Sequence, residues 1–314
     1  MVNALSATHF EFPGQTGFYK GKVRDVYSFE NDRIAIVACD RISAFDHILP
    51  RSIPFKGQIL TQIAALFLDQ TQDIVPNWKT ATPDPQVTLG KKCDPIPVEF
   101  VVRGYLTGHA WREYKSGKTL LCGVVMPDGM VENQAFPQPI LTPSTKAETG
   151  HDEDISFEDI VRRGIVAEDL LNELYRISFQ LFQRGTEIAA ERGLILVDTK
   201  YEFGLWEQKP MLIDEIHTPD SSRYFYADSY SRCLEEGNPQ RQLSKEFVRE
   251  WLIQQGFQGR ENDVMPEMSD EWVQEISERY QELYQVMTGS PLNKRDYSGI
   301  EQSIQTSIIQ SMHS

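Results

Sequence analysis

The sequence predicts an α+β fold of two lobes: an N-terminal, antiparallel, β-rich lobe over residues 1–100 and a larger α/β lobe with C-terminal helices over residues 101–314. The 314 residues, of which 40% are hydrophobic and 11% aromatic, are enough to form a large core. Short apolar runs dominate the first third, and helical periodicity dominates the last part. The elements lack the regular βαβ alternation of Rossmann and TIM-barrel folds.

The first third is predicted to hold two strands and a helix. Residues 23–29 and 34–39 are apolar or β-branched runs, and the Glu-Asn-Asp sequence at 30–32 favours a turn between them. Because the second run is apolar on both faces, we expect it to be a buried strand. After Gly57, apolar residues recur at the spacing of one helix face: Ile59, Leu60, Ile63, Leu66 and Phe67.

Prolines shape the middle of the chain. Pro95 and Pro97 exclude a helix interior and lead into a predicted strand at 98–103. Residues 120–126 are predicted to form another strand, which a turn follows. Residues 137–156 are polar and interrupted by prolines, which predicts a long irregular loop. Loops of that length are often functional.

The second half is predicted to be mostly helical. Ser156 has the character of an N-cap, and a long helix is expected over 167–192, ended by Gly193. Two strands at 194–204 and 211–216 should form a hairpin. The remaining expected elements are helices at 243–253 and 270–287, and a polar tail after Gly299 whose isoleucines recur every four residues, as in a docked or frayed helix.

The charge of the chain limits its partners. The formal net charge is −15 and the pI is near 4.9, which argues against binding nucleic acid or an anionic membrane. Local lysines and arginines could still bind a small anionic substrate. Four scattered cysteines, with no apolar run long enough to span a membrane and no secretory signal, predict a cytoplasmic protein.

The glycine-containing segment 17–27 could bind phosphate. A turn between strands lets backbone N–H groups approach phosphate oxygens, and Lys20, Lys22 and Arg24 surround Gly21 with positive charge. The segment matches neither the P-loop pattern nor the glycine-rich pattern of protein kinases. Taken alone, it is more typical of a solvated hairpin tip.

The hairpin at 194–216 carries acidic residues that could bind a metal. Strand alternation places Asp198, Lys200 and Glu202 on one face, and a hairpin centred on Gln208 places Glu202 opposite Asp214. Opposed carboxylates destabilise paired strands, unless a cation such as Mg²⁺ lies between them and nucleotide phosphates. A solvated, salt-bridged strand face is the alternative, and the apolar flanks favour the metal.

Four further polar segments could line a cleft. They are residues 40–46 after the buried strand, 101–111 around Arg103, 142–154, and 218–224 after the acidic pair. An arginine at a strand end suits bidentate recognition of phosphate or carboxylate. Helix caps, surface ion pairs and an exposed loop are the alternative interpretations of these segments.

Together, six motifs resemble the phosphoribosylaminoimidazole-succinocarboxamide synthase (SAICAR synthetase) family over residues 17–253. They are GKVRDVY (21–27), DRISAFD (40–46), VVRGYLTGHAW (101–111), TPSTKAETGHDEDIS (142–156), VDTKYEFG (197–204) and DEIHTPDSSRY (214–224). The resemblance implies a nucleotide-binding N-terminal lobe with a kinase-like sheet. It also implies an ATP-dependent ligase of purine biosynthesis. Such an enzyme joins L-aspartate to 5-amino-1-(5-phosphoribosyl)imidazole-4-carboxylate (CAIR) and releases SAICAR, ADP and phosphate.

The resemblance also implies roles for individual residues. It assigns ATP binding to Lys20, Gly21, Lys22, Arg24, Lys92, Ile96 and Val98, of which Ile96 and Val98 belong to a hinge at residues 95–99 along the adenine. It assigns substrate binding to Asp40, Arg41, Ser43, Ala44, Asp46, Arg103, His109, Lys146, Glu148, His151, Asp152, Ser222 and Arg223. It assigns Mg²⁺ binding to Glu202, Asp214 and Glu215, and catalysis to Lys22, Asp152 and Lys200.

The reaction implied by the resemblance agrees with the residues present. A carboxylate becomes reactive toward an amine once ATP has phosphorylated it, and phosphoryl transfer needs mainly positioning and positive charge. An acyl phosphate must be kept from water, so we expect the 142–156 segment to form part of a lid. His109 departs from the pattern, because the family usually has a small hydroxyl residue there.

Two other functions remain compatible with the sequence. A kinase-like phosphotransferase would use the same glycine turn and acidic pair but would not depend on aspartate. A non-catalytic nucleotide-binding protein is the second alternative, and it would be expected to have lost Glu202, Asp214 or the cationic turn. The sequence is compatible with either a monomer or a homo-oligomer.

Overall fold

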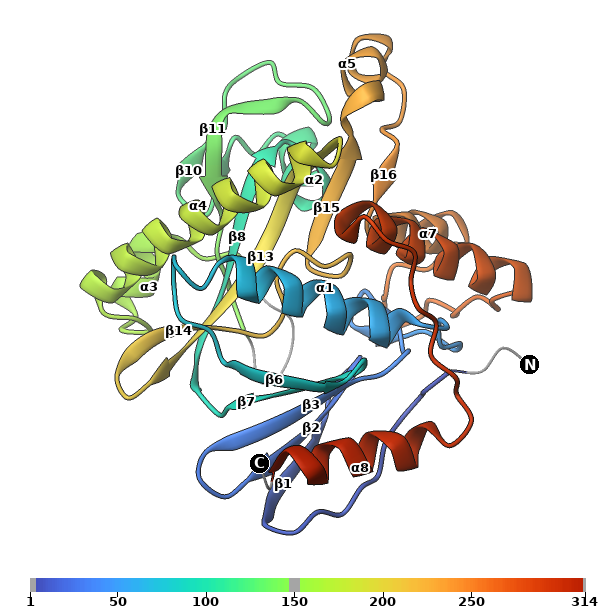
Figure 1. The fold of residues 1–314 in the computed structure, drawn as a ribbon. Helices are drawn as coiled ribbons and strands as arrows, with labels where there is room; N and C mark the ends of the chain where they lie inside the picture. Colours follow the sequence, from blue (N-terminus) through green and yellow to red (C-terminus); the bar gives the residue numbers. More distant parts are fainter. Residues whose placement is uncertain (1–3, 147–152, 313–314) are drawn as a thin grey trace.

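The computed structural model describes residues 4–146 and 153–312, and two antiparallel sheets organise it (Figure 1). The N-terminal sheet has the order β1-β2-β3-β7-β6, with strands Gln15–Lys20, Arg24–Phe29, Arg33–Ala38, Val87–Lys91 and Lys79–Asp84. The larger sheet has the order β11-β8-β13-β15-β16, with strands Ala135–Leu141, Asp94–Tyr105, Leu194–Trp206, Ser222–Tyr226 and Gln242–Leu243. The predicted α+β class with antiparallel sheets is confirmed.

Short strands and hairpins complete the two sheets. β12 (Ser144–Thr145) pairs with β8, and β14 (Lys209–Ile213) pairs with β13. The two remaining pairs are β4 with β5 (Ser43–Ala44 and His47–Ile48) and β9 with β10 (Leu120–Leu121 and Val124–Val125). The expected strand at 120–126 is therefore a short hairpin that turns at Cys122 and Gly123, both of which have positive φ.

The helices pack on the sheets and between them. They are α1 (Lys56–Gln70), α2 (Gly108–Lys115), α3 (Phe157–Arg162), α4 (Glu168–Glu191), α5 (Ala227–Glu236), α6 (Glu246–Gln254), α7 (Asp270–Thr288) and α8 (Ile300–Met312). In Figure 1, α1 crosses the centre of the molecule above the N-terminal sheet, and α8 lies along that sheet from below. The Ser156 hydroxyl caps α3 by accepting a hydrogen bond from the N–H of Asp159, as predicted. None of the helices in the described ranges is long and apolar enough to span a membrane.

The N-terminal sheet is apolar on both faces because each face has a different neighbour. One face packs against α8 and contributes Tyr27, Phe29, Ala35, Val37, Val87 and Leu89 to a cluster with Ile300, Ile304 and Ile308. On the opposite face, Val26, Ile34 and Ile36 line a cavity between the lobes. The regularly spaced isoleucines of the tail therefore form a helix that docks on its own chain.

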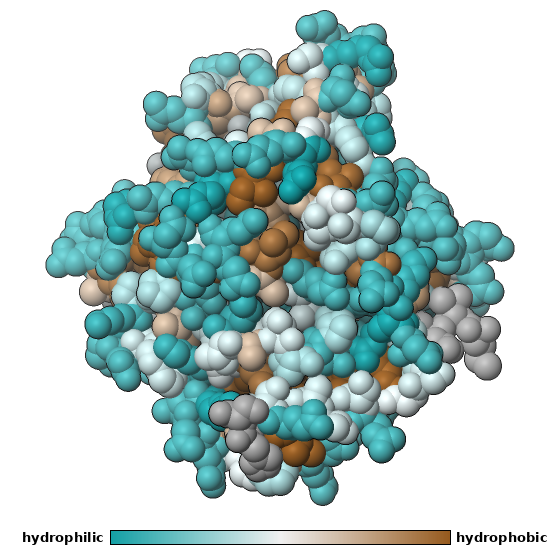
Figure 2. Space-filling view, in the orientation of Figure 1, coloured by the Kyte–Doolittle hydropathy of each residue, from teal (hydrophilic) through white to brown (hydrophobic). Residues whose placement is uncertain are grey.

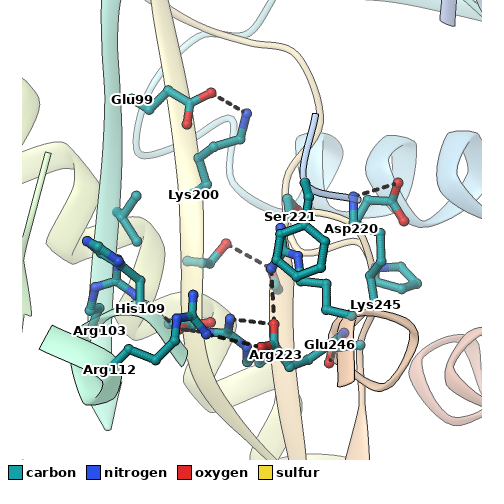
Figure 3. A pocket seen from close by; sticks show the side chains of 18 of the residues that line it. Glu99, Arg103, His109, Arg112, Lys200, Asp220, Ser221, Arg223, Lys245 and Glu246 are labelled. Atoms are coloured by element: carbon teal, nitrogen blue, oxygen red, sulfur yellow. Dashed lines mark hydrogen bonds and ion pairs between the residues drawn. The ribbon is translucent and has the colours of Figure 1, made fainter. Parts of the chain in front are cut away.

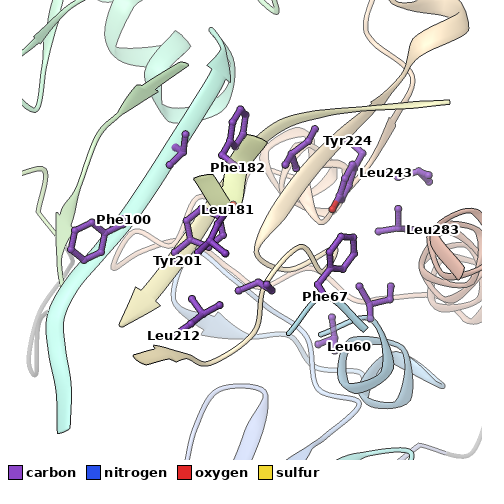
Figure 4. Close-up of a cluster of buried hydrophobic side chains, with 14 of the residues drawn as sticks. Leu60, Phe67, Phe100, Leu181, Phe182, Tyr201, Leu212, Tyr224, Leu243 and Leu283 are labelled. Atoms are coloured by element: carbon purple, nitrogen blue, oxygen red, sulfur yellow. The ribbon is translucent and has the colours of Figure 1, made fainter. Parts of the chain in front are cut away.

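The main hydrophobic core lies between the larger sheet and helices α1, α4 and α7 (Figure 4). Phe67 of α1, Leu181 of α4 and Leu283 of α7 point toward Tyr201 and Tyr224 of the sheet. Burial of such side chains contributes roughly 1.5–3 kcal/mol each. The face shown in Figure 2 is mostly hydrophilic, with hydrophobic residues in separate patches.

Two sequence predictions in this region were wrong in detail. The β13–β14 hairpin turns through two residues, Glu207 and Gln208, both with positive φ, so its centre lies between them. Glu202 consequently faces Ile213, and Asp214 comes one residue later. The expected irregular loop at 137–156 begins as β11, whose prolines are tolerated because this strand is at the edge of the sheet.

The proposed lobe boundary after residue 100 falls inside β8. β8 runs through to Tyr105 and belongs entirely to the larger sheet, while α8 from the C-terminal end packs on the N-terminal sheet. The N-terminal lobe is therefore completed by a segment distant in the sequence.

Replacing Ile304 by alanine tests the docking of α8. Ile304 is fully buried, so Ile304→Ala should lower the free energy of unfolding by about 2–5 kcal/mol in urea titrations. Gln302→Ala, at an exposed position of the same helix, is the control and should have little effect. Equal stability of the two variants would show that α8 does not dock as described.

Candidate active site

Two cavities meet between the lobes, and three residues line both of them. The first, which we call the interlobe cavity, has a volume of about 670 Å³ and lies against the N-terminal sheet. The second, which we call the cationic cavity, has a volume of about 540 Å³ and lies against the larger sheet. Asp46, Glu99 and Lys200 line both cavities, so the two spaces adjoin at these side chains.

The interlobe cavity combines an apolar wall with charged groups. Its apolar wall includes Val26, Ile34, Ile36, Trp78 and Pro95. Its cations are Lys22, Arg24, Lys91, Lys146 and Lys200, and its carboxylates are Asp46, Glu99, Glu202 and Asp214. An apolar wall beside a cluster of cations suits a ligand with a flat base and an anionic tail.

The glycine turn at this cavity is tight, and Arg41 supports it from the side of the protein interior. The N–H of Gly21 donates to the carbonyl of Arg24 at 2.8 Å, and a Cβ at Gly21 would lie 3.0 Å from that oxygen. Arg41 donates to the carbonyls of Gly21 and Lys22 at 2.9 and 3.0 Å. It also donates to Asp25 at 2.8 Å. Arg41 therefore holds the turn in place through the protein interior.

Asp25 and Asp40 are buried structural acids. Burial alone would raise the pKa of Asp25, but Arg41 and the N–H of Thr8 outweigh it and lower the pKa. Asp40 accepts hydrogen bonds from the N–H of Leu5 and Gly57 at 2.7 and 2.8 Å. Its burial raises its pKa despite these bonds.

Some residues of the 40–46 segment therefore support the fold, whereas Asp46 lines the cavities. Asp40 and Arg41 are buried supports, Ala44 lies in the hydrophobic core, and half-buried Ser43 is outside the lining of both cavities as described. Asp46 lines both cavities and forms an ion pair with Lys22. Of the residues predicted to bind substrate in this segment, Asp46 lines the cavities, and Asp40 and Arg41 make buried contacts within the fold.

Carboxylates and cations alternate at the junction of the cavities. Glu202 forms ion pairs with Lys146 and Lys200, and Lys200 also reaches Glu99 at 2.8 Å. Burial alone would raise the pKa of Glu202, but the two ammonium groups outweigh it and hold the pKa well below its ordinary value. Burial likewise opposes the charge of Lys200, and the carboxylates of Glu202 and Glu99 raise its pKa above the ordinary value. Both groups are therefore ionised at neutral pH.

Arg24 holds the second acidic pair. It forms ion pairs with Asp214 and Glu215, and the indole N–H of Trp78 donates to the carbonyl of Asp214 at 2.9 Å. No three metal-binding side chains converge within the described ranges. Glu202 and Asp214 nevertheless line the same cavity. Two carboxylates suit a cation that takes most of its ligands from phosphate and water.

The residues expected to line an adenine ring are displaced along the strand. Ile96 and Val98 point into the hydrophobic core, and Lys20 and Lys92 are exposed and outside the described lining of the two cavities. Lys91, Cys93 and Pro95 line the interlobe cavity in their place. Strand alternation explains this outcome, because Pro95, Glu99, Val101 and Arg103 share the face toward the cavities while the residues between them face the core.

The cationic cavity contains two buried arginines that share one carboxylate. Arg103 reaches Asp198 at 3.4 Å, and Arg223 forms an ion pair with the same oxygen (Figure 3). Gly108, the first residue of α2, packs against Arg223, and a Cβ there would lie 2.4–2.6 Å from the guanidinium. The start of α2 therefore brings its first N–H groups next to the guanidinium of Arg223, an arrangement that suits an anion.

Ser222 and His109, which were also predicted to bind substrate, lie at the same cavity. The Ser222 hydroxyl donates to that of Thr199 at 2.7 Å, and a ring nitrogen of His109 lies 2.7 Å from a carboxylate oxygen of Asp154. Both Ser222 and His109 line the cavity with Arg103 and Arg223. Glu148, His151 and Asp152, which were also predicted to bind substrate, lie outside the described residues.

Sequence reasoning missed several charged residues of the cationic cavity. They are Glu99, Arg112, Lys245, Glu246 and Arg249. Lys245 and Arg249 lie one helical turn apart at the start of α6, a spacing visible in the sequence. Burial lowers the pKa of Lys245 to about 8, and the nearby Asp220 limits the shift. Asp220 itself is held by Lys56 at 2.8 Å and by the hydroxyl of Tyr280 at 2.6 Å.

Comparisons with known proteins show which family the chain is similar to. The family model for SAICAR synthetase matches residues 17–265. The phosphoribosylaminoimidazole-succinocarboxamide synthase of Cytophaga hutchinsonii is 58% identical, covering 99% of this chain and 100% of its own. The enzyme of that name from Bacteroides thetaiotaomicron is also 58% identical, covering 98% of each chain. The solved structure of the SAICAR synthase of Saccharomyces cerevisiae, complexed with SAICAR, has a TM-score of 0.77. It is 34% identical and covers 92% of this chain and 100% of its own.

Acid titration of stability tests the ion pairs of Glu202. Because the pKa of Glu202 is lower in the folded chain than its ordinary value of 4.5, its contribution to stability is complete above pH 4.5 and is lost as the pH falls toward the lowered pKa. Glu202→Gln should lower the free energy of unfolding by about 3 kcal/mol at pH 7. This difference should shrink steadily below pH 4.5 in urea titrations, whereas exposed Glu261→Gln should behave like the wild type throughout.

Proposed function

The chain belongs to the SAICAR synthetase family and is therefore an ATP-dependent ligase of purine biosynthesis, and we propose how its two cavities divide the reaction. The reaction joins the carboxylate of CAIR to the amino group of L-aspartate and releases ADP and phosphate. We assign ATP to the interlobe cavity and CAIR to the cationic cavity. The observation that carries this assignment is the sharing of Asp46, Glu99 and Lys200 by both cavities.

The interlobe cavity suits ATP in both shape and charge. Val26, Ile34 and Ile36 offer an apolar surface to the adenine, while Lys22 and Arg24 lie beside the glycine turn near the phosphates. The turn leaves backbone N–H groups beside these cations, and phosphoryl transfer depends mainly on such positioning and neutralisation. Lys200, at the far end, would then meet the terminal phosphate.

The cationic cavity suits the phosphoribosyl group of CAIR. Arg103, Arg223 and the start of α2 form its anion-binding end, and Lys200 with Glu99 forms the end toward ATP. A CAIR molecule bound with its phosphate at the arginines would direct its carboxylate to the junction. In this assignment the phosphate of CAIR, its carboxylate and ATP would follow one another along the two adjoining cavities.

The chemistry would take place at the junction in two steps. A carboxylate oxygen of CAIR attacks the terminal phosphorus of ATP, and the bond to ADP breaks, giving an acyl phosphate. The amino nitrogen of aspartate then attacks the acyl carbon, loses a proton and expels phosphate. Lys200 would stabilise the charge that moves between phosphate oxygens and carboxylate. Lys146, on the other side of Glu202, would help exclude water from the acyl phosphate.

Glu202 and Asp214 are the residues that would hold Mg²⁺. Their carboxylates line the cavity proposed for ATP, and Glu215 lies beside them on Arg24. When bound, the ion would supply positive charge to the terminal phosphates. Lys146, Lys200 and Arg24, which now pair with these carboxylates, are placed to turn toward the phosphates instead.

A position for L-aspartate and a cellular location for the enzyme complete the proposal. L-Aspartate carries two carboxylates, and we place it near Lys146, which lines the interlobe cavity together with Asp46. We also propose that the enzyme acts in the cytoplasm, since its four cysteines are all free, as in proteins of reducing compartments.

ADP release with defined substrates tests the proposed function. With ATP and Mg²⁺, the wild-type protein should release ADP in proportion to the succinocarboxamide detected by mass spectrometry, and only when both CAIR and L-aspartate are present. Glu202→Gln should lower kcat by about a hundredfold, because the site loses a carboxylate needed for charge balance. ADP release that does not depend on aspartate would favour a phosphotransferase instead.

Replacing Arg223 by lysine tests where CAIR binds. Lysine keeps the charge but loses the planar fork that suits phosphate, which costs about 1.5–3 kcal/mol of binding. The KM for CAIR should therefore rise about ten- to a hundredfold, while the KM for ATP stays within twofold. Arg232→Lys, at an exposed position of α5, is the matched control and should change neither constant. An unchanged KM for CAIR in Arg223→Lys would place CAIR elsewhere.

A further inference from the structure

We propose that Glu246 is a positioning residue that holds the arginines of the cationic cavity in the arrangement that binds the phosphate of CAIR. This inference rests on the proposed placement of CAIR. Glu246 was not recognised in the sequence, and it is the first residue of α6. Its role follows from the number of guanidinium groups that surround one nearly buried carboxylate.

Three guanidinium groups from three different elements converge on Glu246 (Figure 3). Its carboxylate lies 2.8 Å from Arg223 of β15, 3.0 Å from Arg249 of α6 and 3.6 Å from Arg112 of α2. The side chain of Glu246 is 11% exposed, so water screens these charges only weakly. Burial alone would raise the pKa of Glu246, but Arg223 and Arg249 lower it, and the group is ionised at neutral pH.

The carboxylate of Glu246 offsets the repulsion between the neighbouring arginines. Cations gathered in one cavity repel one another and would turn apart toward solvent when no anion is bound. Asp198 holds Arg103 and Arg223 from one side, and Glu246 holds Arg223, Arg249 and Arg112 from the other. Within this cluster four arginines stand against two carboxylates, so it keeps a net positive charge that suits an anion.

Positioning and simple charge attraction predict opposite effects when Glu246 loses its charge. If the cavity acted only through its net charge, Glu246→Gln would add a positive charge and strengthen the binding of CAIR. If Glu246 positions the arginines, the same change releases Arg112 and Arg249 and weakens that binding. The sign of the change in KM therefore separates the two roles.

The experiment is steady-state kinetics of the full chain carrying Glu246→Gln. The KM for CAIR should rise about tenfold, as for the loss of one or two hydrogen bonds to a charged group, while kcat and the KM values for ATP and aspartate stay within twofold. Glu250→Gln removes a carboxylate one turn later on the same helix and should leave all constants unchanged. An unchanged or lower KM for CAIR in Glu246→Gln would overturn the proposal.

A second measurement separates positioning from general damage to the fold. The nucleoside of CAIR, which lacks the phosphate, should inhibit the wild type and Glu246→Gln equally, because the arginines hold only the phosphate. A weaker inhibition of the variant would indicate a collapsed cavity and would contradict the proposal. If Glu246→Gln does not fold, Glu246→Asp keeps the charge with a shorter reach, and it should raise the KM for CAIR in the same selective way.

The two proposals fail in distinguishable ways. If Arg223→Lys leaves the KM for CAIR unchanged, the placement of CAIR is wrong, whatever Glu246→Gln does. If Arg223→Lys raises this KM and Glu246→Gln does not, the placement stands and the positioning role of Glu246 is wrong.

Discussion

The antiparallel pairing of β8 with β13 is the constraint on which the site depends. The register places Asp198 opposite Arg103, Lys200 opposite Val101 and Glu202 opposite Glu99. Side chains of these two strands that face one way line both cavities, and those between them enter the main core. A slip of one residue would exchange the two sets, bringing charges into the core and apolar groups into the cavities. The buried aromatic residues Phe100 and Tyr201, which face each other in this register, therefore also fix the geometry of the site.

This register brings two carboxylates face to face, which is unfavourable unless cations intervene. Lys200 reaches both Glu99 and Glu202, and Lys146 covers Glu202 from the opposite side. The same principle recurs at Asp214 with Arg24, and at Asp198 and Glu246 with the arginines. Each cation proposed to bind a phosphate is thus paired with a carboxylate already in the protein. Binding of the phosphates would exchange partners, so the site would not have to bury new unpaired charge.

The sequence predicted the elements well, because periodicity and caps act locally. The strands at 24–29 and 33–38, the helix at 168–191 and the docked tail were all visible in their patterns. The turn at Glu207 and Gln208 was misjudged by half a residue, since both turn lengths fit the sequence. The supporting roles of Asp40 and Arg41 could not be predicted, because their partners lie in other elements and only the fold brings them together. The alternation along β8 could have identified Glu99 and excluded Ile96 and Val98, had it been followed into the proline-rich start of the strand.

The C-terminal segment connects the two lobes through contacts with residues of the N-terminal lobe. After α7 on the larger lobe, Arg295 forms an ion pair with Asp84 at 2.7 Å, and the hydroxyl of Tyr297 donates to Asp40 at 2.8 Å before α8 docks on the N-terminal sheet. Asp40 also accepts from the N–H of Gly57 at the start of α1, and it directly precedes Arg41 beneath the glycine turn. The glycine turn is therefore connected, through buried hydrogen bonds, to a segment anchored on the opposite lobe. Because the interlobe cavity is bounded by this turn on one side and by β13 on the other, these buried hydrogen bonds support one wall of the cavity from the opposite lobe.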